Sequence, residues 1–95
     1  MELTTAQLDA VVIPIANVLE DAAEVDFWEA RDELTWLLEF GTVDQWEEGV
    51  FKALGMAARQ GYPPAELGDA MRAAAVGRGY ISRDPGLMAS LDQQS

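Results

Sequence analysis

The sequence predicts an all-α fold, a small single-domain bundle of four main helices followed by a short C-terminal helix. Apolar residues recur at three- and four-residue spacings along most of the chain, and caps, glycines and prolines separate the periodic segments. The length of 95 residues fits one domain over positions 1–95. The hydrophobic fraction of 49% is enough for a core, so the high charge does not indicate disorder.

The first predicted helix carries an apolar stripe over positions 8–22, after a cap supplied by Thr4 or Thr5. Pro14 lies inside this stripe and is expected to kink the helix or to split it in two, because a proline removes a backbone donor and its ring crowds the preceding turn. A short strand over positions 11–15 is the alternative interpretation of the same apolar run.

The second predicted helix begins after Asp26, with Glu29 three residues later at the spacing of a capping box. Gly41 is expected to end it in the left-handed conformation that favours glycine. The residues expected to face the core are Phe27, Ala30, Leu34, Leu37 and Leu38.

Thr42 and Gln45 predict a further capping box at the start of the third helix, which is expected to end at Gly61. Its predicted inward residues are Val43, Trp46, Val50, Leu54 and Ala57.

The fourth helix is expected to open at Pro64 and to close at Gly77 and Gly79. Its narrow apolar face is predicted to consist of Leu67, Ala70, Met71, Ala74 and Ala75. Asp84 followed by Pro85 has the pattern of a cap and a first-turn proline, and predicts the short C-terminal helix.

Charge is distributed very unevenly along the chain. Positions 1–50 hold thirteen of the seventeen acidic residues and one basic residue, Arg31, so nearly the whole formal charge of −11 falls on one half. Such a field repels nucleic acid and anionic membranes and attracts basic protein surfaces. The chain has no cysteine, no basic leader and no long uncharged apolar run, so we expect a cytoplasmic protein that does not enter the membrane.

The residue types argue against catalysis. Histidine and cysteine are absent and Lys52 is the single lysine, which removes the usual bases, nucleophiles and soft metal ligands. We therefore expect no enzyme activity, no catalytic residues, no cofactor and no metal site.

Two short acidic motifs, Asp21-x-x-Glu24 and Glu29-x-x-Asp32, resemble those with which all-α nucleotide pyrophosphohydrolases hold magnesium. That resemblance implies a metal-dependent enzyme. The two pairs are separated only by a turn between helices, however, and no basic cluster follows to hold phosphates. The alternative interpretation is a solvated acidic surface.

The stretch over positions 64–83 resembles the end of a winged-helix regulator, in which a helix leads into a Gly-x-Ile-x-Arg wing, here Gly79 to Arg83. The resemblance implies contacts of Arg72, Arg78 and Arg83 with DNA phosphates. A separate recognition helix is missing from the pattern, and the acidic half of the chain opposes the approach of DNA.

Trp36 projects about 200° from the direction of Leu34, the core residue of the second helix, and Phe40 falls on the same outer side. Either the second helix is buried on two sides, or Trp36 is an aromatic anchor ringed by carboxylates. The candidate partner-binding residues are Glu20, Asp21, Glu24, Glu29, Asp32, Glu33, Trp36, Glu39 and Phe40.

These observations favour a non-catalytic acidic interaction module that inhibits a partner by occupying its basic, nucleic-acid-binding surface. Small acidic inhibitors from phages and mobile elements, including anti-CRISPR proteins, are similar in size, charge and lack of catalytic groups, although no motif is shared. The alternative is a self-associating structural or adaptor protein that forms a homodimer. A degenerate helix-turn-helix regulator is the third hypothesis.

Overall fold

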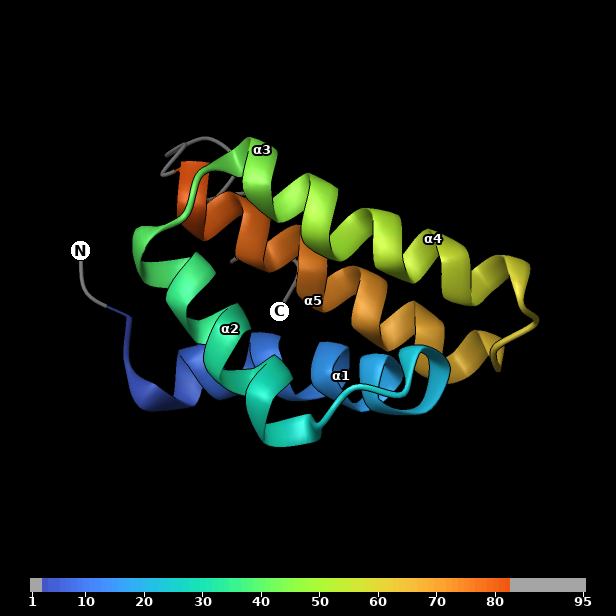
Figure 1. Ribbon diagram of the computed structural model, residues 1–95. Helices are drawn as coiled ribbons and strands as arrows, with labels where there is room; N and C mark the ends of the chain where they lie inside the picture. Colours follow the sequence, from blue (N-terminus) through green and yellow to red (C-terminus); the bar gives the residue numbers. More distant parts are fainter. Residues whose placement is uncertain (1–2, 83–95) are drawn as a thin grey trace.

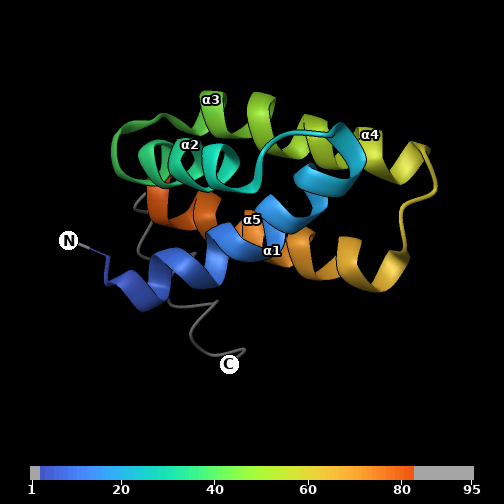
Figure 2. The ribbon, with the colours of Figure 1, turned by 60° about the horizontal axis from the view of Figure 1, so that its bottom comes forward.

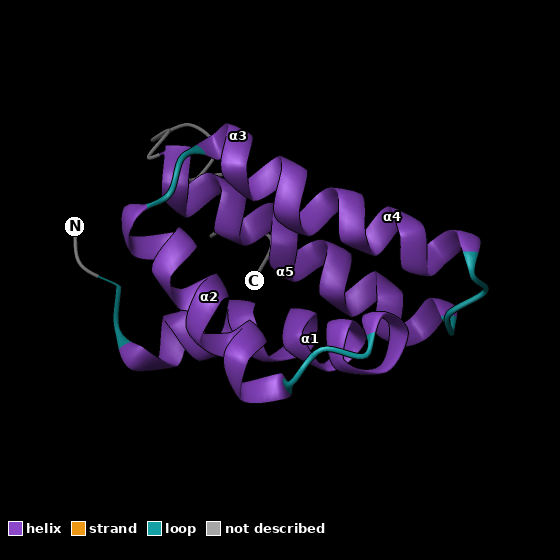
Figure 3. Cartoon of the chain, viewed as in Figure 1, coloured by secondary structure: helices purple, strands orange, loops and turns teal. Residues whose placement is uncertain are grey.

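The structure, a computed structural model, describes residues 3–82, and these form helices joined by short loops without a strand (Figure 3). The all-α prediction is confirmed, and the alternative strand at positions 11–15 is helical instead. The predicted short helix after Asp84 lies outside the described residues. The elements are α1 (Thr5–Ala23), α2 (Phe27–Phe40), α3 (Val43–Trp46), the π-helical turn η1 (Glu47–Phe51), α4 (Lys52–Arg59) and α5 (Pro64–Ser82).

Two of the helices begin at reciprocal capping boxes. The Thr4 hydroxyl accepts the Gln7 backbone N–H at 3.1 Å, while the Gln7 side chain accepts the Thr4 N–H at 2.8 Å. Thr42 and Gln45 make the same pair of bonds at the start of α3, as the sequence predicts. At α2 the Asp26 carboxylate accepts the Glu29 N–H at 3.1 Å. These bonds satisfy backbone donors that have no partner inside the helix.

Pro14 lies within α1, which is assigned as one helix from Thr5 to Ala23, and the kink expected there stays a prediction. Helix α1 ends at Ala23, and the residue that caps it, Glu24, has a φ of 54° in the left-handed region. Elements α3, η1 and α4 follow one another without a loop and form one rod. The rod stops before Gly61, which has a φ of 84°, so glycine supplies the left-handed turn expected at this end.

Two predictions about glycines are wrong. Gly41 follows α2 in an extended conformation, with φ −81° and ψ 174°, rather than a left-handed one. A Cβ atom there would lie 2.7 Å from the Leu37 carbonyl oxygen, so close backbone approach explains the glycine. Gly77 and Gly79 do not close the last helix, because α5 continues to Ser82 and buries both.

Helix α5 contacts every other element of the described fold, and it runs side by side with the α3–η1–α4 rod (Figures 1 and 2). At this seam the Trp46 ring is fully buried, and its Nε1–H donates to the Ala74 carbonyl oxygen at 2.9 Å. A Cβ atom on Gly77 would lie 2.5 Å from the Trp46 ring. The small residues of α5 therefore leave the space into which the large Trp46 ring packs.

The buried face of α5 is rotated from the predicted one. Met71 and Ala75, both expected to face inward, are exposed. The residues that α5 buries are Ala70, Ala73, Ala74, Gly77 and Gly79. The physical reason is that Gly77 lies inside the helix and packs against the Trp46 ring, so the buried stripe runs through the small residues Ala73 and Gly77 rather than through Met71 and Ala75.

Candidate functional site

The outer side of α2 carries six exposed candidate residues, which we call the acidic face. They are Glu29, Asp32, Glu33, Trp36, Glu39 and Phe40. Helix α2 buries Ala30, Leu34 and Leu38, and Phe27 and Leu37 pack against the core half-buried. Its opposite side is exposed, so the interpretation that this helix is buried on two sides is wrong. Helical geometry places the other five residues within about 60° of Trp36, which makes the acidic face one continuous surface.

Trp36 and Phe40 form the apolar centre of the acidic face. Their exposed fractions are 52% and 69%, and their ring centroids lie 6.2 Å apart at an interplanar angle of 46°. The four-residue spacing brings both rings to one side of the helix, where they pack on each other rather than on the core. Such an exposed aromatic pair is a preformed apolar contact surface.

The carboxylates of the acidic face have no ion-pair partner among residues 3–82. Three arginines of this part of the chain are engaged elsewhere: Arg31 pairs with Asp9 at 3.1 Å, and Arg78 with Glu47 at 2.7 Å. Arg72 pairs with Asp69 on α5. Within residues 3–82, no ion pair neutralises the negative charge of the acidic face, which can therefore attract a cation from another molecule.

Three other candidates lie where α1 ends and do not belong to the acidic face. Glu20 and Glu24 are exposed, and Asp21 accepts a hydrogen bond from the Tyr62 hydroxyl at 3.1 Å. Desolvation, followed by the bond to Asp21 and the charges of Asp21 and Glu66, raises the pKa of Tyr62 above 10.0. Asp21 therefore ties the end of α1 to the loop before α5.

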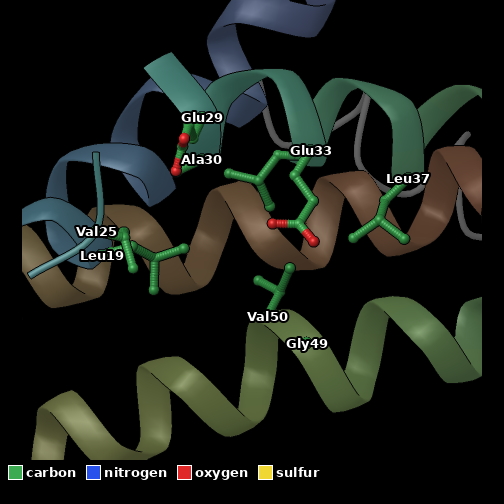
Figure 4. Close-up of a pocket in the computed structure, with 9 residues that line it drawn as sticks. Leu19, Val25, Glu29, Ala30, Glu33, Leu37, Gly49 and Val50 are labelled. Atoms are coloured by element: carbon green, nitrogen blue, oxygen red, sulfur yellow. The ribbon is translucent and has the colours of Figure 1, made fainter. Parts of the chain in front are cut away.

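A groove of about 300 Å³ lies beside the acidic face, between α2, the end of α1 and η1 (Figure 4). Apolar walls come from all three sides, and the carboxyl-bearing side chains at its edge are Glu29 and Glu33. Its lining consists of Leu19, Val25, Glu29, Ala30, Glu33, Leu34, Leu37, Gly49 and Val50. This groove is not predictable from local sequence patterns, because it depends on how far α2 lies from η1 in the assembled fold. A glycine in mid-helix, Gly49, was its one local signal.

Trp28 is a third exposed aromatic residue on α2, and it is not among the residues predicted from the sequence. It is 63% exposed, and the Arg31 guanidinium lies 5.5 Å from its ring centroid. The Phe27 ring is tilted against it at 5.3 Å. Since eight residues separate Trp28 from Trp36, a helical projection places the two about 80° apart and would have found it. Trp28 extends the exposed apolar surface toward the start of α2.

No group of three acidic side chains in the described part of the chain could hold a metal ion. Within the same residues, no helix combines the length and the apolar character that a membrane span requires. Positions 79–82, the expected start of a wing, are the last residues of α5. No family model matches the chain, and neither a curated protein nor a solved structure matches it at a significant level.

Proposed function

We propose that this protein is a non-catalytic interaction module that presents the acidic face to a basic, nucleic-acid-binding surface of a partner protein and thereby inhibits it. One observation carries the proposal: Trp36 and Phe40 are exposed at the centre of four carboxylates that have no ion-pair partner among residues 3–82. The proposed inhibitor acts in the cytoplasm, as small acidic anti-CRISPR proteins do.

The spacing of charge on α2 supports competition with a nucleic acid. Glu29 and Glu39 are ten positions apart on one helix, a distance of about 15 Å at 1.5 Å per residue. Four carboxylates over this length have a mean axial spacing of about 5 Å, of the same order as the roughly 3.4 Å per phosphate along one strand of duplex DNA. A basic groove that follows one strand would meet a similar linear charge density here.

The two aromatic rings add apolar contact area to the acidic face, which charged groups alone do not provide. Exposed ion pairs contribute only about 0.2–1 kcal/mol each and are screened by salt. Buried aromatic anchors, in contrast, dominate the energetics of many interfaces, and surrounding charges mainly accelerate and orient association. Trp36 and Phe40 therefore supply the affinity in this proposal, and the carboxylates select a basic partner.

The test begins with capture of the partner from the native host and continues with the purified partner. The face variant combines Asp32→Asn, Glu33→Gln and Glu39→Gln. The control variant, Asp44→Asn, Glu48→Gln and Glu66→Gln, makes the same change in charge at exposed positions elsewhere. We expect the face variant to weaken binding about tenfold or more and the control to change it little. The melting temperature of each variant separates loss of binding from loss of folding.

Salt and competition complete the experiment. Binding should weaken steeply as salt rises from about 0.05 to 0.5 M, because the Debye length shrinks over this range. The captured partner should release its nucleic acid when the wild-type protein is added. An affinity that is unchanged both by added salt and in the face variant would contradict the proposal.

Self-association through the same aromatic pair is the second candidate, favoured by the exposure of Trp36 and Phe40. A symmetric contact between two α2 helices would bring the four carboxylates of each copy together, which is electrostatically unfavourable. Light scattering over a wide concentration range tests self-association: a constant monomer mass would exclude the dimer.

A further inference from the structure

The groove beside the acidic face combines apolar walls with carboxylates on one edge. Leu19 from α1, Leu37 from α2 and Val50 from η1 provide apolar surface on its different sides. Its volume of about 300 Å³ is large enough for one long side chain from another molecule. The shape and the lining therefore fit a ligand with an aliphatic part.

Glu29 and Glu33 stand one helical turn apart on α2 and both line the groove. Figure 4 shows the Glu33 side chain extending from α2 toward Val50, with its carboxylate over the groove. Neither carboxylate has an ion-pair partner within residues 3–82. The two carboxylates at this edge would attract a cation, and the apolar walls would pack against the methylene groups of a side chain.

We propose that this groove receives an arginine side chain of the partner. The inference rests on the proposed function for the partner and adds the type of side chain that it inserts. The aliphatic stem would lie between Leu37 and Val50, and the guanidinium would bond to Glu29 and Glu33. Arginine fits better than lysine, since its five donors can serve two carboxylates at once and its guanidinium is more weakly hydrated.

Gly49 gives a means of closing the groove without disturbing the core. It lies in η1 and lines the groove, and no heavy atom lies within 4 Å of the position that its Cβ would occupy. Gly49→Leu should therefore fill the groove with an apolar side chain. Gly55 on α4 is the matched control, because its Cβ position is equally open and it does not line the groove.

The test uses n-propylguanidinium, which has the chemistry of an arginine side chain, and follows the methyl groups of Leu37 and Val50 by NMR. We expect saturable shifts in the wild type and in Gly55→Leu. Gly49→Leu should weaken binding at least about tenfold, the effect of removing roughly 1.4 kcal/mol. Glu29→Gln with Glu33→Gln should weaken it about threefold to fivefold. n-Propylammonium should bind less tightly than n-propylguanidinium.

Several results would overturn the inference. Equal shifts with unsubstituted guanidinium would indicate surface charge pairing only, and equal binding of n-butanol would indicate an apolar cavity without charge selection. Unchanged binding in Gly49→Leu would place the ligand elsewhere. The captured partner separates this inference from the proposed function. Capture that depends on Trp36 but not on Gly49→Leu removes the groove and keeps the function, whereas capture insensitive to both removes the function.

Discussion

Trp36 and Trp46 lie ten residues apart in the chain and have opposite surroundings. Trp46 is fully buried, donates its Nε1–H to Ala74 and rests against Gly77. Trp36 is half exposed and packs on Phe40 alone among the aromatic rings, with carboxylates on either side. The same residue type thus serves the fold at the α5 seam and is left to solvent on α2.

The difference lies in what the neighbouring helix offers. Helix α5 presents small residues to Trp46, so a large ring can approach the backbone closely and reach a carbonyl oxygen. On the outer side of α2, Trp36 keeps 52% of its surface exposed, and its neighbours one helical turn away are three carboxylates and Phe40. The contact of Trp46 with α5 therefore contributes to the core, whereas the outer side of α2 stays exposed to solvent.

The largest effect is expected at the buried ring. Trp46→Ala should lower the free energy of unfolding by about 3–5 kcal/mol, because it removes the ring from the core and leaves a cavity. Trp46→Phe should lower it by less, since it keeps most of the ring but loses the hydrogen bond to Ala74, worth about 1 kcal/mol. Urea denaturation followed by circular dichroism measures both. If Trp46→Ala lowers the free energy of unfolding by less than about 1 kcal/mol, the packing of Trp46 against α5 is not a main source of stability.

A pair of glycine substitutions tests the close fit at the same place. Gly77→Ala should destabilise by about 1–3 kcal/mol, because its Cβ would lie 2.5 Å from the Trp46 ring. Gly49→Ala, in open space, should be neutral or stabilise by up to about 1 kcal/mol through its better helix propensity. Thermal melts of the two variants should shift in opposite directions or differ by several degrees.

Asp21 accepts a hydrogen bond from the Tyr62 hydroxyl, whereas no ion pair within residues 3–82 engages the carboxylates of the acidic face. The pKa of Tyr62 is raised, so its contribution to stability is present below pH 10 and is lost as pH rises through the higher folded pKa. Asp21→Asn should lower the Tyr62 pKa, seen by phenolate absorbance in a Tyr80→Phe background. Tyr62→Phe should lose less stability than the wild type above pH 10. An unchanged Tyr62 pKa in Asp21→Asn would show that this contact is not formed in solution.

The smallest change in stability is expected at the exposed ring. Trp36→Ala should alter the free energy of unfolding by no more than about 0.5 kcal/mol, as surface substitutions usually do. Denaturation under the conditions used for Trp46→Ala gives the comparison directly. A loss of several kcal/mol would mean that Trp36 supports the fold, and the acidic face would then lose its role as a free surface.

Much of the fold is readable from the sequence because it depends on local rules. The cap at Asp26 and the box at Thr42 and Gln45 are formed by side chains three residues from their targets, and the inward direction of Trp46 follows from helical spacing. Local rules do not predict the π-helical turn at η1 or the packing of the Trp46 ring against Gly77. They depend on which helix packs against which, and a glycine alone does not tell whether it ends a helix or admits a ring.

The candidate site likewise has a part that follows from local sequence rules and a part that depends on long-range packing. Helical geometry on α2 alone was enough to place Trp36 and Phe40 on one outer side among carboxylates. Whether another helix would cover them could not be decided locally, and the hydrogen bond of Asp21 to Tyr62 joins residues that are far apart in the sequence. The groove at Gly49 requires three elements at once, so only the assembled fold reveals it.

The contrast between the tryptophans also makes the protein its own spectroscopic reporter. Trp46, sealed in an apolar seat, should emit at short wavelength and resist quenchers, whereas Trp28 and Trp36 should emit at long wavelength. The negative field on α2 should concentrate caesium ions near Trp36 and repel iodide. A docked partner would shield the long-wavelength emission and leave the short-wavelength emission of Trp46 unchanged, so binding and unfolding can be followed separately without any label.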